Sequence, residues 1–259
     1  MPIERIRLIE ELAANAWQPA LEQSLEGWRM RYNQGVSRRL NSVWPNLLHG
    51  KLPIEKRVEE VENFYLSRET LPRFQICPAA LPSDLPKILT ARGYSADAYT
   101  HVKTAPIAWV LSKTEANPAL EITTSNILTD EWMRLYRQSA SFDAHGETMR
   151  RGTLTRIGQS ACFVLIKVNQ QKAAIGLGVA ERNWVGVFSM NTLPTFRKQG
   201  AATTILNYLG NWGLELGAQE LYLQVMQSNE NAKNMYAKLG FLELYQYYYA
   251  EARHLISKD

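Results

Sequence analysis

The residues most suited to chemistry begin at position 197. Residues 197–206 read RKQGAATTIL, so Arg197, Lys198 and Gly200 come directly before a run of small and apolar side chains. A helix that begins here offers unpaired backbone amides and about half a positive charge from its dipole, which together attract anions. Gly200 lets a ligand approach the main chain, and the two basic side chains add mobile charge. The stretch therefore indicates a phosphate-binding loop, with a plain strand-to-helix turn as the alternative.

The elements around this loop follow from the periodicity of apolar residues. A helix is expected over 129–140 with Thr129 as its N-cap, and three antiparallel strands over 160–168, 173–181 and 184–192. The helix after Gly200 should end near Gly217. A strand over 220–226, a short helix over 229–240 and a last strand over 241–249 complete the second half.

The first half gives weaker signals in a similar order. It predicts a hairpin turning at residues 33–35, a helix over 53–69, a strand over 73–78 and a helix over 85–94. A polar stretch over 113–124 is expected to be a linker. We therefore predict two domains, residues 1–115 and residues 116–259.

Two motifs in the second half resemble those of the GNAT superfamily of acyl-coenzyme A N-acyltransferases, over about residues 120–250. The spacing R-x-x-G-x-A is matched by Arg197, Gly200 and Ala202. The second motif is matched by Asn229, Ala232, Met235, Tyr236, Lys238, Gly240 and Phe241. The resemblance implies an α+β fold of two tandem GNAT-like domains, each a mixed, mostly antiparallel twisted sheet flanked by helices. The central strands of the C-terminal domain are expected to splay apart, and the N-terminal domain, which lacks R-x-x-G-x-A, is expected to be a degenerate copy.

The resemblance also implies acetyl-CoA as the cosubstrate. Its pyrophosphate would lie at the mouth of the helix, on Arg197, Lys198, Gln199, Gly200, Ala201 and Ala202. Its pantetheine arm would enter between strands 184–192 and 220–226, with contacts from Phe188, Met190, Thr192, Asn229, Ala232 and Tyr236. Asn229 is expected either to hold this arm or to cap the short helix.

For catalysis the resemblance points to Tyr236, which would assist the leaving thiolate, and to a backbone amide near Ser189 for the oxyanion. Ser189 is also a catalytic candidate because, with Asn191, it could order a water chain. The general base is open, since Gly186 stands where some family members carry a glutamate. The remaining candidates around the acceptor are Asp143, His145, Glu147, the tyrosines of 245–249, Arg38, Arg39, Asn41 and Ser42, for which surface, packing or interdomain roles are the alternatives.

Composition limits the other classes of function. The chain has 259 residues and a formal charge of +4, and its basic residues are scattered, which favours a small anionic ligand over nucleic acid. No apolar run is long enough for a membrane span, and the charged N-terminus does not read as a signal peptide, so we expect a cytoplasmic protein. Two cysteines 85 positions apart predict neither a metal site nor a disulfide.

These observations predict an N-acetyltransferase that moves an acetyl group from acetyl-CoA to a primary amine by direct attack in a ternary complex. The alternative is a non-catalytic acyl-CoA-binding sensor or partner-binding module. The acceptor is open among antibiotics, polyamines, amino acids, peptide N-termini and lysine side chains. The chain could be a monomer or a homodimer.

Overall fold

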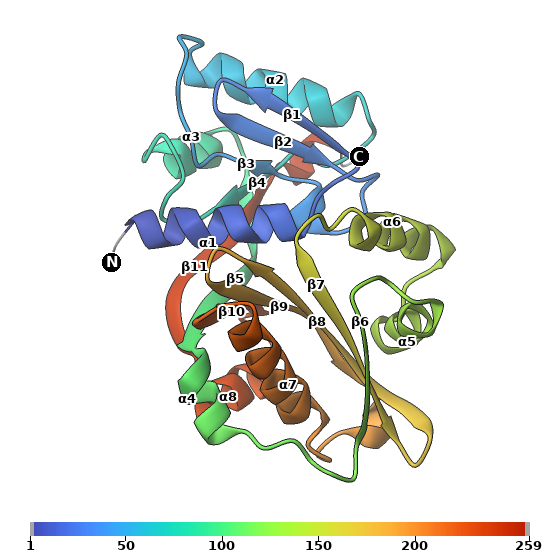
Figure 1. Ribbon diagram of the computed structural model, residues 1–259. Helices are drawn as coiled ribbons and strands as arrows, with labels where there is room; N and C mark the ends of the chain where they lie inside the picture. Colours follow the sequence, from blue (N-terminus) through green and yellow to red (C-terminus); the bar gives the residue numbers. More distant parts are fainter. Residues whose placement is uncertain (1–2, 257–259) are drawn as a thin grey trace.

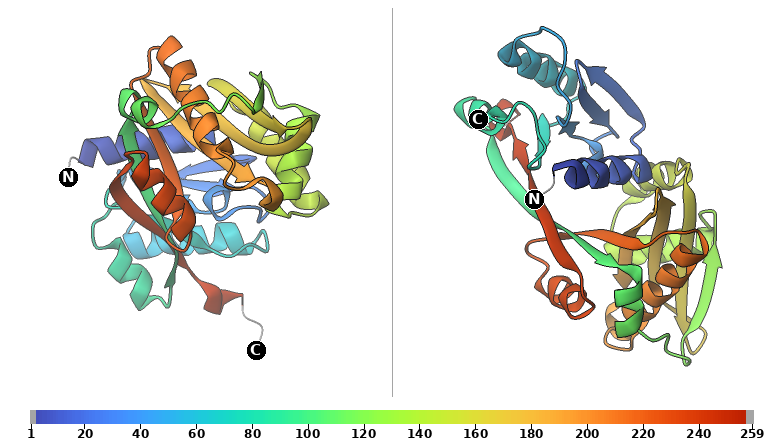
Figure 2. Two further views of the ribbon diagram at one scale, coloured as in Figure 1. Left: turned by 90° about the horizontal axis from the view of Figure 1, so that it is seen from below. Right: turned by 60° about the vertical axis from the view of Figure 1, so that its left-hand side comes forward.

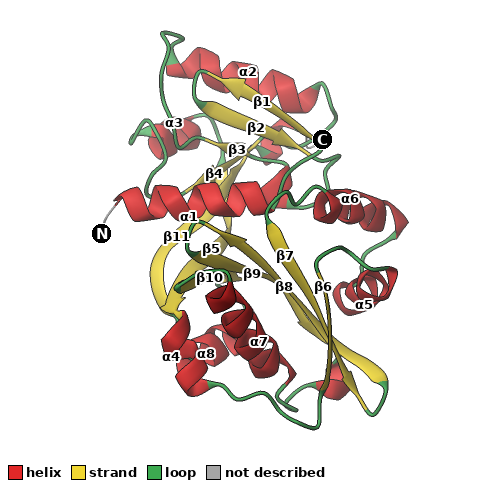
Figure 3. Ribbon diagram, viewed as in Figure 1, coloured by secondary structure: helices red, strands yellow, loops and turns green. Residues whose placement is uncertain are grey.

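One mixed sheet runs through both halves of the chain in the computed structural model, which describes residues 3–256 (Figures 1 and 3). Its strand order is β1-β2-β3-β4-β11-β5-β10-β9-β8-β7-β6. The strands are β1 (Leu21–Leu25), β2 (Trp28–Tyr32), β3 (Val43–Trp44), β4 (Arg73–Ile76), β5 (Ser95–Pro106), β6 (Glu121–Ser125), β7 (Ser160–Val168), β8 (Gln171–Glu181), β9 (Trp184–Thr192), β10 (Glu220–Met226) and β11 (Leu242–Glu251). The helices are α1 (Ile3–Ala16), α2 (Ile54–Leu66), α3 (Leu85–Ala91), α4 (Ile107–Lys113), α5 (Asp130–Ala140), α6 (Ala144–Thr155), α7 (Ala201–Glu215) and α8 (Glu230–Lys238).

Two long strands carry the sheet from one half to the other. β5 is antiparallel to β11 on one side and to β10 on the other, and both β5 and β11 reach from the lower to the upper part of the molecule (Figures 1 and 2). β5 and α4 precede residue 115 in the sequence but pack with elements of the second half. The expected boundary at 115/116 therefore divides the sequence without dividing the sheet.

β7 and β8 are apolar at nearly every position, which suits a sheet that is buried on both faces, as the sheet of the second half is. Phe163 and Leu165 point to the face covered by α5, whereas Val164 and Ile166 point to the face covered by α7. This alternation follows from the two-residue period of a strand. α4 packs beside α7, and α1 lies across the opposite face, between the two parts of the molecule (Figure 1).

A buried carboxylate ties α1 to the strands of both parts. Glu10 accepts hydrogen bonds from Trp44 Nε1 (2.8 Å) on β3, from Gln75 Nε2 (2.7 Å) on β4 and from the Tyr245 hydroxyl on β11. Burial raises the pKa of Glu10, although the Tyr245 and Trp44 donors and the nearby Arg39 lower it. A fully bonded network of this kind fixes the position of the helix.

Most predicted elements of the second half are confirmed within a few residues. Thr129 Oγ1 accepts from Trp132 N (3.2 Å) as the N-cap of α5, and Gly217 and Gly240 follow α7 and α8 with positive φ. α1, β5, α4, β6 and α6 were not expected from the sequence, and β6 lies inside the stretch expected to be a linker. In the first half a hairpin was expected to turn at residues 33–35. β2 and β3 do form an antiparallel pair, but they are joined by the longer segment 33–42, and the tight turn lies between β1 and β2, at Glu26 and Gly27.

Both cysteines, Cys77 and Cys162, are buried free thiols. Within residues 3–256 no helix is both long enough and apolar enough to cross a membrane.

Candidate active site

β9 and β10 separate halfway along their length. They are paired in parallel from Trp184 and Glu220 as far as Val187 and Leu223, and no pairing between them follows. β10 stays with β5 up to Met226, and β9 stays with β8 up to Thr192. The expected splay of the central strands is therefore present, and it leaves facing strand edges that can bond an extended ligand.

β9 carries a bulge where the strands part. Ser189 and Met190 stand opposite the single residue Gly176 of β8, and Ser189 has a φ of 48°. A Cβ on Gly176 would lie 2.5 Å from Ile205 Cγ2 and 2.8 Å from Met190 Sδ, so any larger residue here would crowd both α7 and the bulge. Asn191 Nδ2 donates to the Ser189 carbonyl oxygen (3.2 Å), which holds the bulged segment. The bulge re-aims backbone groups toward the gap between the strands.

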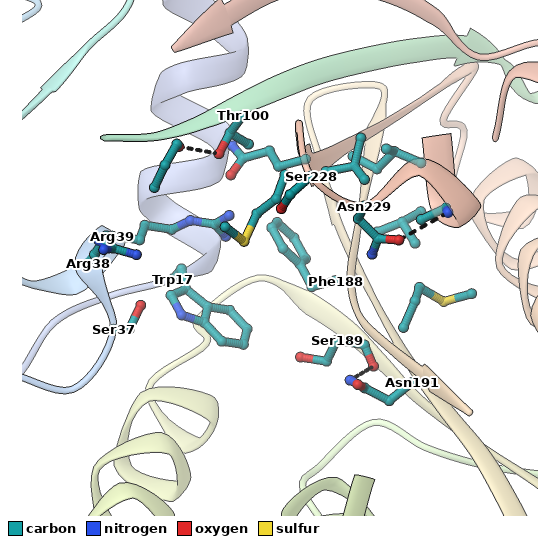
Figure 4. Close-up of a pocket in the computed structure, with 18 of the residues that line it drawn as sticks. Trp17, Ser37, Arg38, Arg39, Thr100, Phe188, Ser189, Asn191, Ser228 and Asn229 are labelled. Atoms are coloured by element: carbon teal, nitrogen blue, oxygen red, sulfur yellow. Dashed lines mark hydrogen bonds between the residues drawn. The ribbon is translucent and has the colours of Figure 1, made fainter. Parts of the chain in front are cut away.

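A cavity of about 800 Å³ lies at this gap (Figure 4). The second half of the chain lines it mainly with the bulge, the end of β10, α8 and β11. These lining residues are Tyr136, Val187, Phe188, Ser189, Met190, Asn191, Leu223, Gln224, Val225, Met226, Ser228, Asn229, Ala232, Tyr236, Tyr247 and Tyr249. The first half adds Trp17, Ser37, Arg38, Arg39, Ala98 and Thr100. One space is thus bounded by both halves.

α8 presents Asn229 and Tyr236 to the cavity. Asn229 is the N-cap of α8, and its Oδ1 accepts from Ala232 N (3.1 Å). The Tyr236 ring is buried against Phe241, with ring centroids 5.6 Å apart. Its hydroxyl has no hydrogen-bond partner in the part of the chain that the structure describes, and burial raises its pKa to about 12. The hydroxyl is therefore a free donor at neutral pH.

The mouth of α7 has the features that the sequence predicted. Gly200 is the N-cap with a φ of 84°, and no side chain caps the first amides of the helix. Arg197, Lys198 and Gln199 are exposed, and neither Arg197 nor Lys198 forms an ion pair with any described residue. Asn117 Nδ2 donates to the Gln199 carbonyl oxygen (3.2 Å) and so steadies the loop. Residues 197–202 lie outside the lining of the cavity.

Of the residues from the first half that line the cavity, only Arg38 and Arg39 were candidates in the sequence. Trp17 stacks on Phe188 with ring centroids 5.6 Å apart, and Arg39 lies over the same ring, with its guanidinium carbon 5.9 Å from the centroid. In Figure 4 the Arg39 side chain extends toward Phe188. Gln224 accepts from the Tyr247 hydroxyl (3.2 Å). Gln224 was missed, although a single polar residue inside the apolar strand ELYLQVM is a usable signal.

Several sequence candidates lie elsewhere. Thr192 ends β9 opposite Ala174 and does not line the cavity. Asp143 accepts from Gly146 N (2.7 Å) as the N-cap of α6, and Glu147 is paired with Arg137 (2.8 Å), so these residues begin a helix and do not line the cavity. His145, Asn41 and Ser42 are also absent from its lining, and Asn41 shapes its own loop by accepting from Asn33 N and Gly35 N. A Cβ at Gly186 would lie 2.5 Å from the Tyr222 hydroxyl, which fills the space that a base would need.

Comparisons with known proteins agree with the fold. A family model described as "Probable histone acetyltransferase Rv0428c C-terminal" matches residues 4–250. The uncharacterized N-acetyltransferase YobR of Bacillus subtilis (strain 168) is 26% identical over 247 residues, which cover 95% of this chain and 98% of YobR.

Two solved structures share the fold at low sequence identity. A GCN5-related N-acetyltransferase from Kribbella flavida superposes with a TM-score of 0.69 at 14% identity, covering 95% of this chain and 94% of that one. A tandem GNAT protein from the clavulanic acid biosynthesis pathway gives a TM-score of 0.59 at 16% identity, covering 82% and 75%.

The matched family and the curated relative define an N-acetyltransferase, and the solved structures show that it has the GNAT fold, as the two motifs predicted. Within that superfamily the chain belongs to the family of the probable histone acetyltransferase Rv0428c C-terminal region.

Proposed function

We propose that this protein transfers the acetyl group of acetyl-CoA to a primary amine by direct attack, with both substrates held together in the cavity between β9 and β10. The observation that carries the proposal is that one space is lined by the bulge of β9, by Tyr236 and by a wall from the first half. Two substrates in one space convert a bimolecular reaction into an effectively unimolecular one.

The coenzyme would bind along the second half of the chain. Its pyrophosphate fits the mouth of α7, where unpaired amides, a glycine in the left-handed region and two cations without a described ion-pair partner come together. Its pantetheine amides fit the strand edges freed by the splay, in the place of an added strand. Phe188, Met190, Asn229 and Ala232 line the cavity and would contact this arm.

Two groups of the chain are suited to stabilise the charges that develop during the transfer, a backbone amide of the bulge and the Tyr236 hydroxyl. The amine nitrogen attacks the thioester carbonyl, and the oxygen that becomes negative accepts from a backbone amide of the bulge at Ser189 and Met190. The carbon–sulfur bond then breaks, the electron pair stays on sulfur, and the attacking nitrogen loses one proton to water to give the neutral amide. Tyr236 donates to this thiolate, and because its pKa lies near 12, above that of a thiol, a hydrogen bond is favoured over full proton transfer.

The described wall of the cavity offers no carboxylate or imidazole to take the proton of the acceptor amine. None of the described lining residues is Asp, Glu or His. We therefore propose that the amine is deprotonated by water, which Ser189, Asn191 and Gln224 can order. The reaction then depends on the fraction of the amine that is already neutral.

Release of free CoA from acetyl-CoA, measured across a panel of amines, tests this function. The panel should hold amino acids, polyamines, aminoglycosides and basic peptides, since the family description names a histone acetyltransferase. Release that depends on one acceptor, with a product heavier by the mass of one acetyl group, supports the transferase. Tight binding of acetyl-CoA with no release for any amine would favour the acyl-CoA sensor.

A further inference from the structure

The cavity carries positive charge with no negative charge in its own wall. Among the described residues that line it, Arg38 and Arg39 are charged, and none is Asp, Glu, His or Lys. Both arginines come from the 3-10 turn Arg38–Leu40 that follows β2, on the side opposite α8 (Figure 4). A charge in a partly enclosed space needs an opposite charge nearby. An arginine that already has a carboxylate partner in the protein is therefore less able to bind an anionic ligand than one that has none.

The charge of Arg38 is satisfied within the protein. Its Nη2 lies 2.8 Å from Asp97 Oδ2, and its Nε lies 2.9 Å from Glu251 Oε1. Glu251 is itself buried and bonded to Arg73 (2.7 Å). Arg38 is therefore part of a structural ion-pair network and has little charge left for a ligand.

Arg39 is half-buried, and no described carboxylate pairs with it as Asp97 and Glu251 pair with Arg38. Its guanidinium lies over the Phe188 ring and beside the Tyr247 hydroxyl, which in turn donates to Gln224. No described carboxylate lies within 4.0 Å of it. Glu10 is near enough for Arg39 to lower its pKa, but its oxygens are bonded to Trp44, Gln75 and Tyr245.

We infer that the acceptor is a small amine that carries a carboxylate, an amino acid, and that Arg39 binds this carboxylate. The inference rests on the proposed function. A guanidinium pairs with a carboxylate through two parallel hydrogen bonds, which fix orientation as well as position. Arg39 contacts Phe188, and Phe188 directly precedes the bulge at Ser189, so a short molecule held at Arg39 reaches the acetyl site with its amine.

The same wall disfavours the other acceptor classes. A polyamine or a basic peptide would bring further positive charge toward Arg39 and would find no carboxylate in the described lining. An amino acid instead supplies the negative charge that this wall lacks. Arg39 is thus a specificity-determining residue, and its effect should fall on the acceptor and not on the coenzyme.

The test compares each free amino acid with its own carboxamide, which keeps the amine and removes the negative charge. Wild-type protein should acetylate at least one amino acid with a kcat/KM about 10- to 100-fold above that of its carboxamide. Arg39→Gln should remove most of this preference, mainly through KM, and Arg39→Lys should restore part of it. Acetyl-CoA affinity, measured by calorimetry, should be unchanged in both variants.

Arg38→Gln is the matched comparison, because it removes the same charge from the neighbouring position. It should lower thermal stability through the loss of the contacts to Asp97 and Glu251 and keep the preference for the amino acid. Aminoalkyl phosphates and basic peptides complete the acceptor set. The inference is overturned if a phosphate, a polyamine or a peptide is preferred, if Arg39→Gln keeps the preference, or if acetyl-CoA binds and no amino acid reacts. Failure of acetyl-CoA to bind at all would instead overturn the proposed function.

Discussion

At the scale of single residues, Tyr236 combines a buried ring with a hydroxyl that no described group bonds. We expect Tyr236→Phe to lower kcat by about a hundredfold, because only the hydrogen bond to the departing thiolate is lost. The ring remains, so the dissociation constant for acetyl-CoA should change little. Steady-state kinetics with any accepted amine and calorimetry with acetyl-CoA check the two parts. A variant that turns over at the wild-type rate would assign this role to water.

The pH dependence of the rate follows from two groups. The raised pKa of Tyr236, about 12, keeps its phenol protonated, so this group should cause no loss of activity as the pH rises to about 10. The described cavity wall holds no carboxylate or histidine that could act as a base. We therefore expect kcat/KM to rise with pH and to level off near the acceptor amine's own pKa.

Profiles with two acceptors of different amine pKa measure this directly. The rising limb should move with the acceptor. A limb fixed near neutral pH for both would show that an enzyme group takes the proton, and our account of deprotonation by water would fail.

Gly200 tests the phosphate-binding loop. Its φ of 84° is unfavourable for a side chain, whereas a Cβ there would meet only ordinary contacts, the nearest at 3.7 Å to Asn117. Gly200→Val should weaken acetyl-CoA binding by about tenfold or more, because the branched side chain stands at the amides that the pyrophosphate needs. Calorimetric titration of the folded variant measures the change.

The other end of α7 provides the matched control. Gly217 has a φ of 81°, and a Cβ at this position would meet no atom within 4 Å, so Gly217→Val brings similar backbone strain far from the loop. Both variants should lose similar stability, and Gly217→Val should bind acetyl-CoA as the wild type does. Equal affinity in the two variants would show that the mouth of α7 does not bind the phosphates.

At the scale of elements, the packing of α7 on β8 positions both the bulge and the helix mouth. A methyl group on Gly176 would lie 2.5 Å from Ile205 on α7 and 2.8 Å from Met190 in the bulge. We expect Gly176→Ala to cost about 1–3 kcal/mol of unfolding free energy through overpacking, and to lower kcat as the bulge shifts. Denaturant titration and initial rates check both effects.

Gly158 serves as the control for that substitution. A Cβ there meets nothing within 4 Å, so Gly158→Ala should change stability by less than about 0.5 kcal/mol. If Gly176→Ala proved as harmless as Gly158→Ala, the bulge would not depend on close contact with α7.

The same elements show what the sequence can predict. Motif spacing and apolar periodicity predicted α5, β7 to β10, α7 and α8, and local signals such as Thr129, Gly217 and Gly240 mark the ends of the helices. The resemblance also singled out Tyr236, Asn229 and the backbone near Ser189, all of which line the cavity. Trp17 could not be assigned to the site, since only the three-dimensional packing of α1 brings it onto Phe188.

Long-range pairing explains the other elements that sequence reasoning missed. The first five residues of β5 are exposed or half-buried, so they lack the apolar pattern of a strand. The strand is held in the sheet by pairing with β10 and β11, which lie more than 110 residues further along the chain. α6 was not expected from the sequence, because only part of one face of that helix is buried. Patterns within a short window carry no information on such pairings.

At the scale of the whole molecule, the two halves differ in what their helix starts can bind. α2 begins after Pro53, which has no amide hydrogen to offer. The loop before it already holds a carboxylate, since Glu26 accepts from Lys51 N (3.2 Å) and Leu52 N (2.9 Å) and pairs with Arg57. The Leu52 amide contributes most to a lowered pKa for Glu26, so this carboxylate is charged at neutral pH. The Glu26 carboxylate thus occupies the place at the start of α2 where an anionic ligand would otherwise bind.

The shared sheet also determines how the halves can be tested. Cutting the chain at 115/116 would take β5 away from both β10 and β11, so we expect neither fragment to form the cavity. The intact chain is therefore the sample for any binding measurement.

Calorimetric titration of the full chain with acetyl-CoA tests the central proposal most directly. The proposal places one coenzyme per chain, at the mouth of α7 and between β9 and β10, and leaves the first half to bound the acceptor side of the cavity. We predict a stoichiometry near one. Two equivalents per chain would show that the first half binds coenzyme as well, and the absence of binding would contradict the proposed site.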